Sequence, residues 1–153
     1  MNYWLMKSEP SECSIDDAIA APNKTVPWVG VRNYQARNFM RDSMRLSDGV
    51  LFYHSSCAEP GIVGIACVAS APYPDPTQFE SESRYFDPKS KPDQPRWMLV
   101  DVQAINKTRN LTLIELRATP YLAELLVLQK GSRLSITPVD ARHWQIISHM
   151  LLK

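Results

Sequence analysis

The chain has 153 residues, of which 44% are hydrophobic and 22% charged, and its formal net charge at pH 7 is +1. This composition is ordinary for a globular protein and excludes disorder of the whole chain, and the near-zero charge excludes the strongly basic surface that drives nonspecific nucleic-acid binding. The apolar runs are much shorter than the ~20 residues needed to cross a bilayer, and the N-terminus has no signal-peptide pattern. We expect one domain over residues 1–153, in the cytoplasm, with no membrane segment and with a monomer as the expected state.

The three cysteines and three histidines of the chain are not spaced as metal ligands. The cysteines are odd in number, irregularly placed and without a C-x-x-C pair, and the histidines form no H-x-x-x-H. The sequence therefore predicts no disulfide framework, no metal site and no cofactor.

The first half of the chain alternates strand and helix patterns. Ser14 followed by Asp17 resembles a capping box, and proline ends both the first strand and the first helix. Between Asn33 and Met44, apolar residues recur at helical spacing. In chain order the expected elements are a strand at 3–7, a short helix from Ser14 to Pro22, an amphipathic helix at 33–44, and strands at 50–54 and 62–71.

The second half begins with a long proline-rich segment, residues 72–96, without helix or strand periodicity, whose aromatic residues indicate that it packs down on the domain. After it, the patterns predict strands at 97–105 and 111–116 joined by a turn at 106–110, a helix at 121–128, a strand at 133–138 and a terminal helix at 140–152. About five or six strands with helices at intervals favour a mixed α+β domain built on a curved β-sheet or β-barrel.

Several stretches are more specific than core packing requires. The most specific is the block from Trp28 to Phe39, and further ones lie at Lys7 to Pro10, Phe52 to Ser55, Glu59 to Ile62, Tyr73 to Asp75, Tyr85 to Lys89, Trp97 with Val100 to Val102, and Arg133 to Val139. Together these stretches resemble the EVE domain family, over nearly the whole chain. The resemblance implies a PUA-like fold similar to that of YTH domains and, as partner, a nucleic acid carrying a modified base, notably a modified cytosine in DNA, although a modified RNA base remains open.

Binding a single base requires unstacking it at a cost of a few kcal/mol, and an aromatic face returns roughly 1 to 3 kcal/mol by stacking. Trp28 is the predicted stacking residue because it precedes a glycine turn and a helix rather than lying in a periodic apolar stretch; the alternative is a core tryptophan. The other candidates for base binding are Ser8, Asn33, Tyr34, Tyr53, His54, Ser55 and Tyr85.

Structural alternatives stand beside several of these candidates. Asn33 is equally suited to cap a helix, His54 to be a hydrogen-bonded core histidine, and Tyr85 to anchor the long loop. For phosphate or other polar contacts the candidates are Lys7, Glu9, Arg32, Arg133 and Ser135, and the alternative for each cation is a surface ion pair.

Three functions remain after these considerations. The first is a non-catalytic module that binds a modified base in an aromatic pocket, with the side chains of Trp28, His54 and Arg133 converging on one cleft. The second is an enzyme acting on a nucleotide or a small molecule in the same pocket, with Ser8 or Ser55, His54 and Asp101 as its catalytic group. The third is a protein-interaction module. Because the chain has no nucleophile elbow, phosphate-cradling glycine loop or zinc-deaminase motif, the first is favoured.

Overall fold

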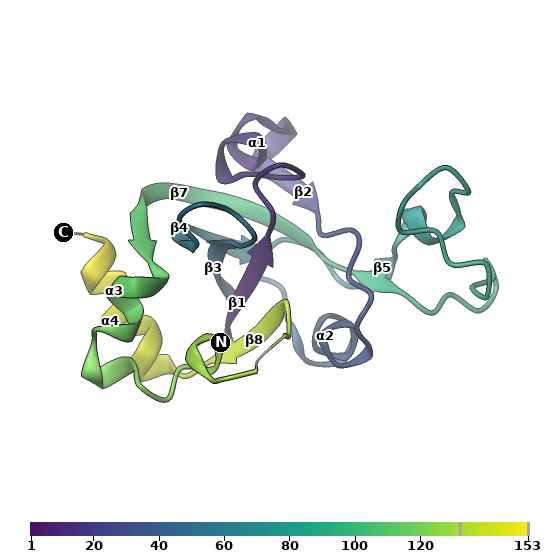
Figure 1. Ribbon diagram of the computed structural model, residues 1–153. Helices are drawn as coiled ribbons and strands as arrows, with labels where there is room; N and C mark the ends of the chain where they lie inside the picture. Colours follow the sequence, from purple (N-terminus) through teal and green to yellow (C-terminus); the bar gives the residue numbers. More distant parts are fainter. Residues whose placement is uncertain (132, 153) are drawn as a thin grey trace.

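The structure is a computed structural model that describes residues 1–131 and 133–152. A mixed six-stranded sheet forms its frame, with the strand order β2-β7-β4-β3-β1-β8 (Figure 1). Its strands are β1 (Tyr3–Ser8), β2 (Thr25–Pro27), β3 (Gly49–His54), β4 (Gly61–Val68), β7 (Asp101–Thr112) and β8 (Ile136–Val139). β1 pairs with β3 in parallel, and every other neighbouring pair in this sheet is antiparallel. The predicted α+β class is confirmed; β2 and β8 are edge strands, so the described sheet is open and not a closed barrel.

The helices are short, apart from the last. They are α1 (Ile15–Ala20), α2 (Tyr34–Asn38), α3 (Leu113–Arg117) and α4 (Ala141–Leu151), with a π-helical turn η2 (Phe39–Ser43) directly after α2 and 3-10 turns η1 (Pro22–Lys24), η3 (Pro76–Phe79), η4 (Pro120–Leu122) and η5 (Leu126–Leu128). No helix among the described residues combines the length and hydropathy needed to span a bilayer.

Side-chain alternation along the central strands creates two cores, one on each face of the sheet. Met6 and Phe52 belong to a core covered by α1 and by α2 with η2, whereas Leu5 and Leu51 belong to a core covered by α3, η4, η5 and α4. Successive strand residues point to opposite faces, so each strand contributes to both cores. α3 and α4 lie at one end of the sheet, and the loop after β5 extends from the other (Figure 1).

The predicted pair of strands with a turn at 106–110 is wrong. β7 continues through these residues and pairs with β4 from Val102 to Thr112, with register shifts that accommodate its bending. The polar residues there reflect exposure on an already paired strand, not a turn. The predicted strand at 111–116 is also wrong, because Thr112 caps α3 by accepting a hydrogen bond from the Glu115 N–H at 3.2 Å.

The predicted helix at 121–128 is replaced by η4 and η5, two separate 3-10 turns, the first of which begins at Pro120. β2 was not predicted, because a three-residue strand ending in Pro27 gives little periodicity. The segment 72–96 is more regular than expected: β5 (Tyr73–Pro74) pairs with β6 (Met98–Leu99), and η3 lies between them.

The amide of Gln78 organises the long loop from inside. This side chain is fully buried; its Nε2 donates to the carbonyls of Asp75 and Trp97, and its Oε1 accepts from the Ser90 hydroxyl and the Trp97 N–H, at 2.6 to 3.0 Å. All of these partners lie between Asp75 and Trp97, so the buried amide ties the two ends of the long loop to each other. The predicted packing on the domain is confirmed where Arg32 and Glu12 contact the loop, and the rest of the loop extends from the sheet (Figure 1).

Candidate functional site

A cavity of about 620 Å³ lies where the end of β1, the segment from Pro27 to Asn33, the long loop and the approach to β8 come together. This volume is within the range of about 300 to 1,000 Å³ that is usual for small-ligand sites. Most of the predicted site residues line it: Lys7, Ser8, Glu9, Trp28, Arg32, Asn33, Ser55, Tyr85, Arg133 and Ser135. Residues that were not among the predicted site residues also line it, including Glu12, Cys13, Gly30 and Arg84.

Trp28 is both a wall of this cavity and a core residue. Its side chain is only 7% exposed, and its ring meets Phe52 edge-on at a centroid distance of 5.3 Å. The backbone N–H of Trp28 donates to the Val100 carbonyl at 3.0 Å. Trp28 is therefore a core residue, as the alternative interpretation expected, and it also lines the cavity. Replacing it should disturb the packing of the core as well as the site.

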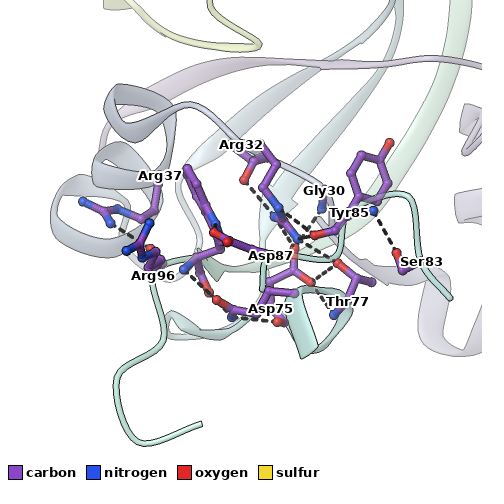
Figure 2. Close-up of polar contacts among 12 residues, drawn as sticks. Gly30, Arg32, Arg37, Asp75, Thr77, Ser83, Tyr85, Asp87 and Arg96 are labelled. Carbon is purple, nitrogen blue, oxygen red and sulfur yellow. Dashed lines mark hydrogen bonds and ion pairs between the residues drawn. The ribbon is translucent and has the colours of Figure 1, made fainter. Parts of the chain in front are cut away.

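Arg32 fixes the long loop against the cavity. Its guanidinium donates to the Asp75 carboxylate at 3.1 Å, to the Thr77 hydroxyl at 3.0 Å and, through two nitrogens, to the Tyr85 carbonyl at 3.1 and 2.7 Å (Figure 2). A further bond to the Val31 carbonyl at 2.9 Å engages the last of its five N–H groups. Arg32 is thus a positioning residue in this structure, since a phosphate contact would require one of these bonds to break.

Asp75 is the buried counterpart of Arg32. Its side chain is 1% exposed and also accepts from the Gly30 N–H at 2.8 Å and from the Thr77 N–H at 2.8 Å. A buried carboxylate is stable only when it is paired and hydrogen-bonded in this way. The network joins the segment before α2 to η3 and so holds this part of the cavity wall against the long loop.

In this wall of the cavity, the Gly30 backbone packs against the ring of Tyr85. Gly30 has φ of +86°, and a Cβ built on it would lie 2.6 Å from the Tyr85 ring. The position therefore requires glycine for its backbone conformation and for its close contact with the ring.

The Tyr85 hydroxyl donates a hydrogen bond to the Glu12 carboxylate, at 2.7 and 2.6 Å from its two oxygens. Arg84 forms an ion pair with the same carboxylate at 2.6 Å. Burial and the hydrogen bond to Glu12 raise the pKa of Tyr85 to about 12. The phenol consequently remains a hydrogen-bond donor at neutral pH.

The end of β1 forms the opposite part of the cavity lining. The Lys7 N–H donates to the Ser135 carbonyl at 2.8 Å, which places the approach to β8 beside β1, and the Ser8 hydroxyl donates to the Cys13 carbonyl at 2.6 Å. The Ser55 N–H donates to the Ser8 carbonyl at 3.0 Å. Burial lowers the pKa of Lys7, and its ammonium has no hydrogen-bond or ion-pair partner in the part of the chain that the structure describes. It is available to a ligand.

Asn33 caps a helix and also lies at the cavity, while its predicted contact with a base stays a prediction. Its side-chain oxygen caps α2 by accepting from the Ala36 N–H at 3.0 Å, as the structural alternative proposed. The residue also lines the cavity.

Three predicted base-binding residues do not line the cavity. His54 accepts a hydrogen bond on Nε2 from the Ile15 N–H at the start of α1, at 3.1 Å. This contact corresponds to the alternative interpretation of His54 as a structural, hydrogen-bonded histidine. Tyr53 is 3% exposed in the core beneath α3 and α4. Tyr34 is exposed and stacks on Trp97, with ring centroids 4.7 Å apart. The predicted convergence of Trp28, His54 and Arg133 therefore holds for Trp28 and Arg133 only.

The comparisons with known proteins agree with one another. The family model of the EVE domain matches residues 2–150. Mouse thymocyte nuclear protein 1 is 41% identical over 163 residues, covering 95% of this chain and 72% of that protein.

Two solved structures extend this likeness to the fold. A crystal structure of a Pseudomonas putida protein is 48% identical, with a TM-score of 0.91 and coverage of 97% of this chain and 98% of that one. The human THYN1 protein, crystallised in complex with DNA containing 5-methylcytosine, is 39% identical, with a TM-score of 0.93 and coverage of 100% and 99%. On the family match and these identities, the chain belongs to the EVE domain family.

Proposed function

We propose that this protein binds nucleic acid and holds one unstacked base, a modified cytosine, in the cavity bounded by Trp28 and Tyr85. The observation that carries the proposal is the combination of these two aromatic side chains with the cations Lys7, Arg84 and Arg133 around one cavity. Aromatic faces bind bases, and cations bind the phosphates beside them. The complex of the human relative with DNA containing 5-methylcytosine supports the choice of ligand.

The expected preference for the modified base is modest. Burial of one methyl group contributes about 0.8 kcal/mol, which corresponds to about a fourfold difference in Kd. Stacking contributes roughly 1 to 3 kcal/mol per base and does not depend on the methyl group. The aromatic walls therefore determine the affinity, and the methyl group adds discrimination between otherwise similar bases.

A non-catalytic role is part of the proposal. The enzyme alternative needs His54 and Asp101 in one hydrogen-bonded group. In the structure the acceptor nitrogen of His54 is bonded to the Ile15 N–H, and Asp101 accepts from the Tyr73 hydroxyl at 2.5 Å. These bonds favour structural roles for both residues.

The direct test is a binding series with oligonucleotides that differ at one position. Fluorescence anisotropy is measured with cytosine, 5-methylcytosine, 5-hydroxymethylcytosine or thymine in one sequence context, as DNA and as RNA. We expect the modified cytosine to bind most tightly, with no new product on chromatography. Arg133→Gln, at the cavity, should weaken binding; Arg142→Gln, on the exposed start of α4, is its matched control.

Salt dependence supplies a second readout. Each phosphate contact contributes a slope of about −0.9 in a plot of log K against log salt concentration for duplex DNA. Among the described residues, four cations line the cavity, Lys7, Arg32, Arg84 and Arg133. Because the Arg32 guanidinium is bonded within the protein, at most three of them can contact phosphates, and a shallow slope is expected. Equal affinity for all oligonucleotides with a steep slope would contradict base recognition, and binding of peptides alone would favour the protein-interaction alternative.

The cytoplasmic location and the monomeric state stay predictions.

A further inference from the structure

The rim of the cavity holds three side chains that form one cluster, Glu12, Arg84 and Tyr85. We propose that Arg84 and the Tyr85 hydroxyl form a binding subsite for a phosphodiester of the nucleic acid, and that the Glu12 carboxylate occupies this subsite until the ligand displaces it. The inference rests on the proposed function, because it names the group that binds the phosphate next to the bound base.

The contacts of Glu12 are those expected of a phosphate. Its two carboxylate oxygens accept from the Tyr85 hydroxyl at 2.7 and 2.6 Å, and one of them also accepts from Arg84 at 2.6 Å. Short bonds from a guanidinium and a phenol to one anionic group are typical of charge-assisted phosphate recognition. All three residues line the cavity, so an anion in the place of this carboxylate would lie beside a base inside it.

Tyr85 is held in place without Glu12, and the Arg84 guanidinium lies over its ring, 5.1 Å from the centroid. The Tyr85 carbonyl is fixed by two nitrogens of Arg32, its N–H donates to the Ser83 hydroxyl at 3.0 Å, and its ring rests on Gly30. Glu12, in contrast, lies on the turn after β1, and its side chain makes the contacts to Arg84 and Tyr85 alone among the described residues. Rotation of one glutamate side chain would therefore expose an already positioned phenol with a guanidinium beside it.

Displacement of Glu12 is energetically easy. The side chains of Arg84 and Glu12 are 67% and 35% exposed. Exposed ion pairs contribute little to stability, because water competes for both partners. A phosphodiester held at the same time by its stacked base has the advantage of a high effective concentration at the subsite.

Four variants test this subsite with an oligonucleotide containing 5-methylcytosine. Glu12→Gln keeps an acceptor for the Tyr85 hydroxyl but removes the competing charge, and should tighten binding up to about fivefold, the factor that an exposed ion pair allows. Arg84→Gln should weaken binding. In the double variant Glu12→Gln/Arg84→Gln the gain from removing Glu12 should largely disappear, because the masked cation is no longer there. Glu82→Gln, an exposed carboxylate in the same loop, controls for the general change in charge.

The outcomes separate this inference from the proposed function. If the parent binds and Glu12→Gln gives no more gain than Glu82→Gln, or gains equally with and without Arg84, the subsite is refuted and the proposed function stands. If the parent binds no oligonucleotide, the proposed function fails. The subsite is then tested by titrating inorganic phosphate into Glu12→Gln while the NMR signals of the Arg84 and Tyr85 side chains are followed. Shifts that saturate support the subsite, and unchanged signals refute it.

Discussion

Replacing Trp28 tests the double role of the cavity wall. Trp28→Ala removes an indole that is 7% exposed and packed edge-on against Phe52. Such a truncation in a core costs about 3 to 5 kcal/mol of unfolding free energy. For a domain of this size, that corresponds to a fall in Tm of roughly 6 to 20 °C. The free energy of unfolding of natural domains is about 5 to 15 kcal/mol in total, so a folded population of the variant should remain at low temperature.

The affinity of Trp28→Ala for oligonucleotides should also fall, and this loss can be measured separately from the loss of stability. Loss of roughly 1 to 3 kcal/mol of stacking corresponds to an increase in Kd of about 5- to 150-fold for modified and unmodified oligonucleotides alike. Trp28→Phe keeps an aromatic face and should retain more of both the affinity and the stability. Urea unfolding gives the stability, and anisotropy at 10 °C, on protein shown to be folded by circular dichroism, gives the affinity.

Two results would refute this account of Trp28. A Trp28→Ala protein that is folded and binds as tightly as the parent would show that the base does not stack there. A variant with the parent's unfolding free energy would show that the indole contributes little to the core, contrary to its contacts with Phe52.

Three further substitutions test the surrounding structure. Gly30→Ala combines a backbone at φ +86° with a contact to the Tyr85 ring, so we expect about 1 to 3 kcal/mol of destabilisation and weaker oligonucleotide binding; unchanged thermal unfolding would contradict this. Arg32→Lys cannot reproduce five N–H contacts and should loosen the long loop, measured as faster amide exchange and proteolysis there. Burial lowers the pKa of His54, and its unprotonated Nε2 accepts a hydrogen bond from the Ile15 N–H. The unfolded chain therefore binds the proton more readily, and stability should decline as the pH falls below about 6.5, the unperturbed value. Urea midpoints at pH 5 and 7.5 should show a smaller difference for His54→Gln than for the parent.

The sequence predicted those parts of the fold that are encoded by local patterns. The strand at 3–7, the helix started by Ser14 and the terminal helix correspond to β1, α1 and α4, because alternation, a capping box and helical periodicity are properties of neighbouring residues. β7 was divided in error, because exposed polar residues in a long paired strand resemble a turn when the partner strand is unknown.

The candidate site was predicted in part for a similar reason. The family resemblance located the segments around Trp28 and Tyr85, but it could not say which aromatic side chains face the cavity, and Tyr53 and Tyr34 point elsewhere. Glu12 and Arg84 were missed because their contact joins positions 72 residues apart, and neither lies in a local motif. Only the folded chain brings them together.

The pairing of β1 with β8 has a consequence for synthesis of the chain. β1 is made before the other strands of the described sheet, but one of its two neighbours, β8, is made after all of them, and the same pairing brings Ser135 to the cavity beside Lys7. Until β8 is made, β1 has an unpaired edge, and the cavity lacks one wall. Contacts of such large sequence separation also slow folding. A nascent or shortened chain that lacks β8 should therefore contain both aromatic walls and still offer no closed site to a ligand, so that binding competence arises only once β8 has been made.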